Sequence, residues 1–139
     1  MNVDTEVVTG KTYGFEKLEI WGLASSLIQE IYESAMQLPK TEMFGLGDQM
    51  RRAVVSVALN IAEGRAADTD AEFRRFLGIS LKSLVEVVAC LKISQSLGFM
   101  AQPRVIEICS QCDRLEAKLR AFRGALQRQT KTGLRRKDR

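Results

Sequence analysis

Two cysteines, Cys109 and Cys112, have a spacing that comes nearest to a redox or zinc motif in this 139-residue chain. A zinc site needs four ligands, and the sequence offers neither a second cysteine pair nor a histidine. The absence of histidine also removes the commonest general base and the Glu-x-x-His pairs of helical di-iron sites. Cys112 falls among apolar residues at helical spacing, so we interpret both cysteines as small buried residues. We expect no metal, no cofactor and no catalytic activity.

Basic residues are the second group that could do chemistry. The chain has 21 Lys and Arg against 17 Asp and Glu, and residues 128–139 hold six of these cations against one Asp. Arginine pairs bidentately with phosphate, and clustered cations release counterions when they bind nucleic acid. Arg120 and Arg123 flank an apolar stripe on the last predicted helix. The predicted nucleic-acid contacts are Arg51, Arg74, Arg75, Arg114, Lys118, Arg128, Lys131, Arg135, Arg136, Lys137 and Arg139. The alternative is solvated helix faces balanced by carboxylates, and a solubilising tail.

Polar residues interrupt the uncharged stretch from Ala53 to Ala62. They share one helix face with flanking charges, and two further polar residues share a face on the next predicted helix. A buried polar group without a partner costs about 1–3 kcal/mol, so such residues should be hydrogen-bonded. We predict a structural polar network or a subunit interface made of Arg52, Ser56, Asn60, Glu63, Ser83 and Glu86. Arg52 is expected to pair with Glu86 or Glu63. A ligand-binding polar groove is the alternative.

Apolar residues at spacings of three and four predict the elements that position these groups. Thr69-Asp70-Ala71-Glu72 fits a capping box at the start of the third helix, and Gly64 and Gly98 fit the residues that follow helix ends. Pro103 is expected to open the last helix. The predicted helices cover about residues 15–38, 46–64, 69–97 and 103–127. The fold class is therefore all-α, an antiparallel, up-and-down four-helix bundle, because no strand pattern competes.

Three regions follow from this pattern: a flexible N-terminal arm at residues 1–14, the bundle at 15–127 and a basic C-terminal tail at 128–139. The N-terminal sequence MNVDTEVV is acidic and lacks the apolar core of a signal peptide. No run of 18 uncharged apolar residues is long enough to cross a bilayer. We expect a cytoplasmic protein without a membrane partner.

The third predicted helix carries two apolar stripes instead of one. The first consists of Phe73, Leu77, Ser80, Leu84, Val87 and Leu91. The second consists of Phe76, Ile79, Ser83, Glu86, Cys90, Ile93 and Leu97. A helix that is apolar on two sides is buried on two sides. We therefore expect a homo-oligomer; a compact monomer that buries the second helix centrally is the alternative. The fourth helix has one regular stripe: Val105, Ile108, Cys112, Leu115, Leu119, Phe122 and Leu126.

Four segments carry a family resemblance. FEKLEIWGLASSLIQEIY, LPKTEMFGLGDQMRRAVVSVALNIAEG, EFRRFLGISLKSLVEV and the later SLGF resemble the four-helix-bundle proteins encoded within 23S rRNA intervening sequences. The resemblance covers roughly residues 15–127. This family is similar to the accessory variability determinant of diversity-generating retroelements, a homopentamer that binds nucleic acid and a reverse transcriptase. The resemblance implies a ring of five protomers and a non-enzymatic role near RNA.

Two classes of function follow. The first is a non-enzymatic, oligomeric RNA- or DNA-binding accessory or structural factor linked to rRNA intervening sequences. The alternative is a protein–protein adaptor that docks a partner enzyme, with nucleic-acid binding incidental. An enzyme that holds an anionic substrate with converging Arg and Glu side chains is the least favoured hypothesis.

Overall fold

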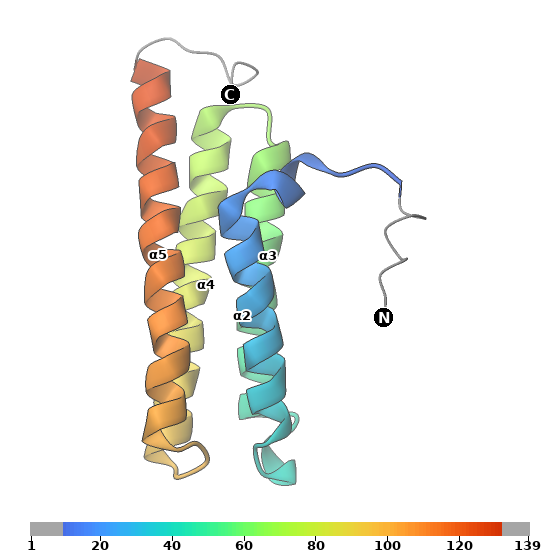
Figure 1. The fold of residues 1–139 in the computed structure, drawn as a ribbon, viewed down its shortest axis with the longest axis vertical. Helices are drawn as coiled ribbons and strands as arrows, with labels where there is room; N and C mark the ends of the chain where they lie inside the picture. Colours follow the sequence, from blue (N-terminus) through green and yellow to red (C-terminus); the bar gives the residue numbers. More distant parts are fainter. Residues whose placement is uncertain (1–9, 132–139) are drawn as a thin grey trace.

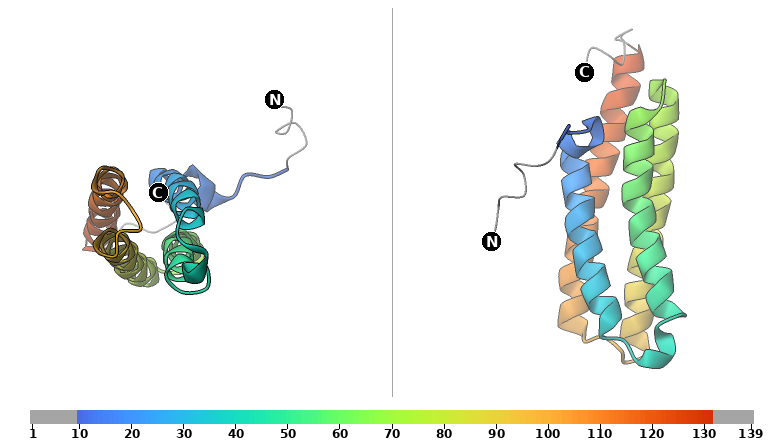
Figure 2. Two further views of the ribbon diagram at one scale, coloured as in Figure 1. Left: turned by 90° about the horizontal axis from the view of Figure 1, so that it is seen from below. Right: turned by 90° about the vertical axis from the view of Figure 1, so that its right-hand side faces the viewer.

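The computed structural model describes residues 10–131. Consecutive long helices run antiparallel, and no strand occurs in this part of the chain (Figure 1). Seen end-on, the helices follow one another around the bundle in chain order (Figure 2). The prediction of an all-α, up-and-down four-helix fold is confirmed. The elements are η1 Gly14–Lys17, α2 Glu19–Met36, η2 Lys40–Glu42, α3 Leu46–Ala66, α4 Asp70–Ser96 and α5 Gln102–Lys131.

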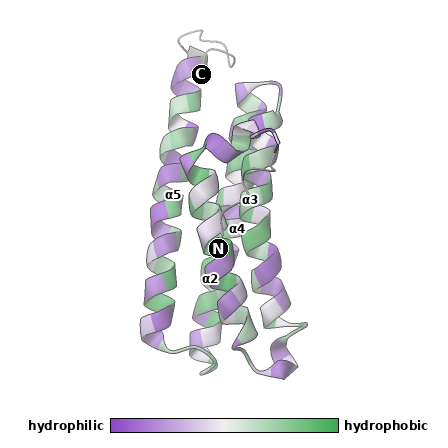
Figure 3. Ribbon diagram, turned by 45° about the vertical axis from the view of Figure 1, so that its right-hand side comes forward, coloured by the Kyte–Doolittle hydropathy of each residue, from purple (hydrophilic) through white to green (hydrophobic). Residues whose placement is uncertain are grey.

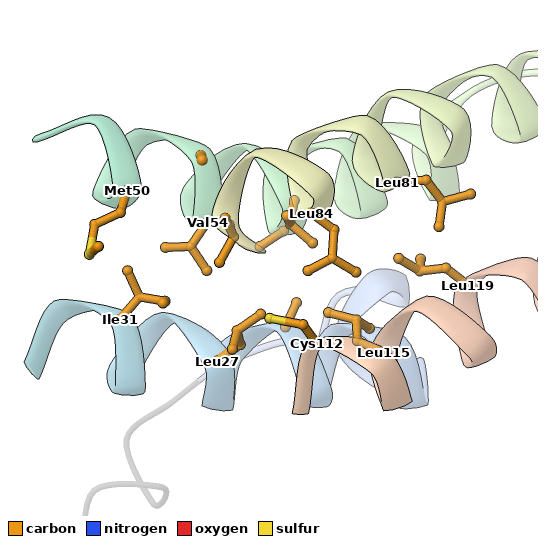
Figure 4. Close-up of a cluster of buried hydrophobic side chains, with 14 of the residues drawn as sticks. Leu27, Ile31, Met50, Val54, Leu81, Leu84, Cys112, Leu115 and Leu119 are labelled. Carbon is orange, nitrogen blue, oxygen red and sulfur yellow. The ribbon is translucent and has the colours of Figure 1, made fainter. Parts of the chain in front are cut away.

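The core is formed by one face of each long helix. Leu27 of α2, Val54 of α3, Leu84 of α4 and Leu115 of α5 point into a shared interior and are almost inaccessible to solvent (Figure 4). Burying a side chain of this kind contributes about 1.5–3 kcal/mol. Along α5 the buried positions alternate with hydrophilic outward ones (Figure 3). The stripe predicted for this helix is confirmed, since six of its members are buried and Phe122 packs against the core.

Two predicted helix ends are confirmed by their geometry. The Thr69 hydroxyl accepts a hydrogen bond from the Glu72 backbone amide at 3.1 Å and so caps α4. Gly98 has a φ of 77°, a conformation that favours glycine, directly after Leu97 at the end of α4. The last helix begins at Gln102, one residue before Pro103, and it extends past Gln127 to Lys131.

Gly64 corrects one prediction, because it does not follow the end of its helix. It lies inside α3, which continues to Ala66, and it is buried against α4. A Cβ atom at Gly64 would lie 2.8 Å from Cδ1 of Phe73 and 3.0 Å from Cβ of Phe76. The glycine is therefore required for the close approach of α3 to the first turns of α4, and not for chain reversal.

The four helices do not pack equally. The α3–α4 interface is the most extensive, and α2 and α5 touch least among the helices that are neighbours. An ion-pair cluster strengthens this last side: Arg104 of α5 donates to Glu30 of α2 at 2.6 Å and to Glu107 at 2.7 Å. These hydrogen bonds, led by the one to Glu107, raise the pKa of Arg104. Among the described residues, no helix is both long and apolar enough to cross a membrane.

Candidate nucleic-acid interface

Two residues of the predicted polar network join α3 to α4, and a third supports them from α3. The Ser56 and Ser83 hydroxyls share a hydrogen bond of 2.7 Å across the two helices. The Asn60 side-chain amide donates to the Ser56 carbonyl at 2.8 Å and to its hydroxyl at 3.1 Å. These polar groups satisfy one another inside the protomer, which fixes the register of α3 against α4 without a ligand.

The charged members of the predicted network lie apart from that cluster. The predicted pairing of Arg52 with Glu86 or Glu63 is wrong, because Arg52 instead contacts Asp48 at 3.0 Å. Asp48 lies four residues earlier on the same helix face, whereas Glu86 is on α4 and Glu63 lies eleven residues further along α3. Glu86 accepts a hydrogen bond from Gln49 at 2.6 Å, and Glu63 is exposed.

Basic side chains from α4 and α5 surround a surface groove. The groove consists of two adjoining hollows of about 390 and 210 Å³, and both hollows share Arg120 and Arg123. No acidic residue lines either hollow. The groove lies where the first half of α4 runs beside the last half of α5, at the upper end of the bundle in Figure 1. We call this feature the basic groove, after its charged lining of Arg74, Arg75, Lys82, Arg120 and Arg123.

Backbone contacts hold the centre of the basic groove in place. Nε of Arg123 donates to the backbone carbonyl of Arg74 at 3.0 Å, which ties α5 to α4. The Arg123 guanidinium lies over Gly78, where a Cβ atom would be 3.2 Å from its Nη2. The absence of a side chain at Gly78 therefore lets Arg123 cross the face of α4.

The cations of the basic groove differ in how far other residues neutralise them. Arg75 pairs with Glu72 and Arg120 pairs with Glu116, both at 3.1 Å and both exposed. Exposed pairs of this kind contribute about 0–1 kcal/mol, so a phosphate can compete for these arginines. Arg74, Lys82 and Arg123 make no ion pair with any described carboxylate. Nε of Arg74 is buried and has no acceptor among the described residues.

The other predicted contacts whose side chains the structure describes lie outside the basic groove, except for Arg128, which adjoins it. Arg128 extends it, since its Nη1 would lie 3.5 Å from a Cβ at Gly124, a lining residue. Arg51 is not a free cation: it donates to the Met43 carbonyl at 2.8 Å, and its side chain is only 23% exposed. Lys118 faces Glu19 of α2 at 3.5 Å, and Arg114 is exposed elsewhere on α5.

The remaining predicted contacts belong to the C-terminal tail. Their side chains lie outside the part of the chain that the structure describes: Lys131, Arg135, Arg136, Lys137 and Arg139.

Sequence reasoning missed Lys82 and did not bring Arg120 and Arg123 together with Arg74. The antiparallel connection of α4 and α5 could have predicted that Arg123 lies near Arg74. Residues equally distant from the turn of a helical hairpin face each other, and the turn between α4 and α5 includes Gly98. Arg74 precedes Gly98 by 24 residues and Arg123 follows it by 25, so the two lie at a similar height along the hairpin.

The cysteines occupy packed positions. Burial, with smaller contributions from Cys109 and Asp113, raises the pKa of the Cys112 thiol from 9.0 to about 12. Cys109 is half-buried, and burial is the main cause that raises its pKa as well. Among residues 10–131, no group of three or more His, Cys, Asp or Glu is placed to hold a metal ion. A protonated, buried thiol is a poor nucleophile and a poor metal ligand.

Cys112 should make stability depend on alkaline pH. Below pH 9 the thiol is protonated in both the folded and the unfolded chain, so it adds no pH dependence. Between pH 9 and about 12 only the unfolded chain loses this proton, and the free energy of unfolding should fall by about 1.4 kcal/mol per pH unit. Chemical denaturation of the reduced protein at several pH values should show a flatter profile for Cys112→Ala. Equal slopes for both proteins would contradict the assignment.

The class of protein is thus an antiparallel four-helix bundle with a basic groove between its last two helices. Residues 16–121 match the 23S rRNA-intervening sequence protein family, and the chain belongs to this family. No curated protein matches the chain. The relation to the accessory variability determinant stays a prediction.

A solved structure supports the fold. The chain is similar to a Bacteroides thetaiotaomicron protein described as having unknown function and coming from the S23 ribosomal protein family. The two share 19% identity with a TM-score of 0.68, over 75% of this chain and 97% of the other. At this identity the likeness shows a common fold.

Proposed function

We propose that the protein is a non-enzymatic accessory factor that binds RNA through the basic groove. The observation that carries the proposal is the convergence of five cationic side chains from two helices on hollows that no acidic residue lines. The name of the family, which refers to a 23S rRNA intervening sequence, makes RNA the favoured polyanion. The proposal places the protein in the cytoplasm, with the ribosomal RNA.

Phosphate contacts of this kind give affinity without reading base sequence. Arginine presents a planar fork that matches two phosphate oxygens, and Arg74, Arg120 and Arg123 offer three such groups side by side. Each phosphate that is neutralised releases bound counterions, so the affinity should depend steeply on salt. Arg128 and the basic residues 131–139 would extend the contact beyond the groove.

We propose further that the protomers form a homo-oligomer, with five copies as the expected number. The first apolar stripe of α4 is buried inside the protomer, whereas the second reaches the surface. Ile93 is 48% exposed and Leu97 57%, and a partner subunit would cover them. Several copies of the basic groove on one particle would raise the avidity for a long RNA. Native mass spectrometry at micromolar concentration should give a multiple of the 15.6 kDa chain; a monomer would contradict this proposal.

The RNA proposal is tested by fluorescence anisotropy across a salt series. Structured 23S rRNA fragments and duplex DNA are titrated with the full chain and with a chain that ends at Gln127. We expect log affinity to fall linearly with log salt, with a slope of about 0.9 per phosphate on duplex DNA and less on single strands. The shortened chain should retain most of the binding, because the groove lies within residues 74–127. Absence of binding at low salt would overturn the proposal.

The exposed apolar side chains of α4 also support the second candidate, an adaptor that docks a partner enzyme. The two functions differ in one measurable way. An adaptor would be isolated with a single protein partner at fixed stoichiometry, and nuclease treatment would leave that complex intact. An RNA-binding factor would lose its associated material on the same treatment.

A further inference from the structure

We infer that the basic groove accepts single-stranded RNA, with an unpaired base in the wider hollow and the neighbouring phosphates against the narrower one. This inference rests on the proposed function and adds the kind of RNA that is bound. It starts from a difference between the two hollows that their charge alone does not explain.

The wider hollow combines cations with apolar surface. It holds about 390 Å³, and the apolar side chains of Ile79 and Leu81 line it together with the bare backbone of Gly78. Phosphate gains nothing from apolar surface, whereas the flat face of a base does. The narrower hollow holds about 210 Å³, and Arg74 and Gln127 line it without any apolar side chain. Phosphate is the group that suits this second hollow.

Arg75 supplies a stacking surface beside the wider hollow. Its guanidinium carbon lies 4.6 Å from the centre of the Phe76 ring, within the range of a cation–π contact. The Arg75 side chain is 56% exposed and lines the hollow. Unpaired bases stack on arginine planes as well as on aromatic rings. The contact with Phe76 restrains the Arg75 guanidinium at the edge of the hollow, where a base could stack on it.

A duplex could not fill the wider hollow. In an RNA double helix the bases are stacked inside, and the narrow major groove closes their edges to side chains. A duplex can therefore offer its phosphates, together with the 2′-hydroxyls and base edges of its shallow minor groove, but not the face of an unstacked base. A single strand can turn one base outward into the hollow and still place the adjacent phosphates near Arg120 and Arg123, the two residues that both hollows share.

Filling the wider hollow without changing charge tests this inference. The variant is Gly78→Leu, whose Cβ atom would lie 3.2 Å from the flexible end of the Arg123 side chain. The probes are a short RNA strand of A and C, which cannot pair with itself, and the same strand annealed to its complement. Because any shift of Arg123 weakens phosphate contacts to both probes, we expect affinity for the single strand to fall about tenfold more than affinity for the duplex, the value of one lost base stack.

Two further variants keep the test interpretable. Gly22→Leu places the same side chain on an open face of α2 and should leave both affinities unchanged. Arg75→Lys keeps the charge but removes the planar stacking face, and it should weaken single-strand binding selectively even if Gly78→Leu does not fold.

The outcomes separate the inference from the proposed function. Equal losses for single strand and duplex, or no loss for either in both groove variants, would overturn the inference and leave phosphate binding by the groove intact. Failure of the unmodified protein to bind either RNA would overturn the proposed function itself. Melting temperatures of all variants, measured by circular dichroism, show whether the fold is retained.

Discussion

Replacing Arg74, Arg120 and Arg123 together by glutamine is expected to lower affinity for RNA about 100-fold at low salt. These three arginines line the narrower hollow, and each would give at least one charge-assisted hydrogen bond to phosphate. With roughly 1 kcal/mol for each exposed contact, the three together reach this factor. Glutamine is shorter than arginine but remains polar, so the change removes the charge without adding an apolar side chain. Fluorescence anisotropy with the same RNA measures the effect.

A matched control is available on the same helix. Arg114 and Lys118 are exposed residues of α5 that do not line the basic groove, and their double replacement by glutamine removes two charges elsewhere. We expect this control to weaken binding only slightly, through the lower net charge. If both variants lost affinity in proportion to the charge removed, binding would be a property of overall charge, and the assignment to the groove would be wrong.

Replacing Gly64 by leucine is expected to destabilise the protein by about 3 kcal/mol or more. Even the first atom of the new side chain would lie 2.8 Å from the ring of Phe73, which is fully buried. Overpacking of a filled core costs about 1–3 kcal/mol, and a leucine adds further atoms to that clash. Either α3 and α4 separate or the Phe73 side chain leaves its site. Denaturant unfolding followed by circular dichroism gives the loss directly.

The control for this prediction is the same change at Gly22. Gly22 lies on an exposed face of α2, and a Cβ atom there would meet nothing within 4 Å. Leucine is the better helix former by nearly 1 kcal/mol, so Gly22→Leu should stabilise the protein slightly. The two substitutions share their chemistry and differ in surroundings. Equal effects at both positions would show that the contact of Gly64 with Phe73 does not limit the packing of α3 against α4.

Most of the fold could be predicted from the sequence because its signals are local and repeated. The unbroken stripe of α5, the Thr69 cap and the glycine at position 98 each depend on a few neighbouring residues, and all three are confirmed. Gly64 shows where such reasoning fails. A glycine near a helix end suggests a stop, but the contact with Phe73 depends on the distance between two helices. No local pattern contains that distance.

The candidate site depended even more on tertiary contacts. Arg74 and Arg75 could be selected as basic residues, but nothing near them in sequence shows that Arg123 crosses Gly78 to reach them. Arg51 illustrates the reverse error, since it was predicted to contact nucleic acid, whereas its guanidinium donates to the Met43 carbonyl. Which arginines are occupied by the fold and which remain open to a ligand is decided by contacts between elements.

The most direct test of the central assignment is photo-crosslinking of the full-length protein to RNA that contains 4-thiouridine, followed by mass spectrometry of the crosslinked peptides. We expect crosslinks in residues 72–82 of α4 and 116–128 of α5, the segments that form the basic groove and its extension. Crosslinks confined to α2 and α3, with none in these two segments, would contradict this assignment.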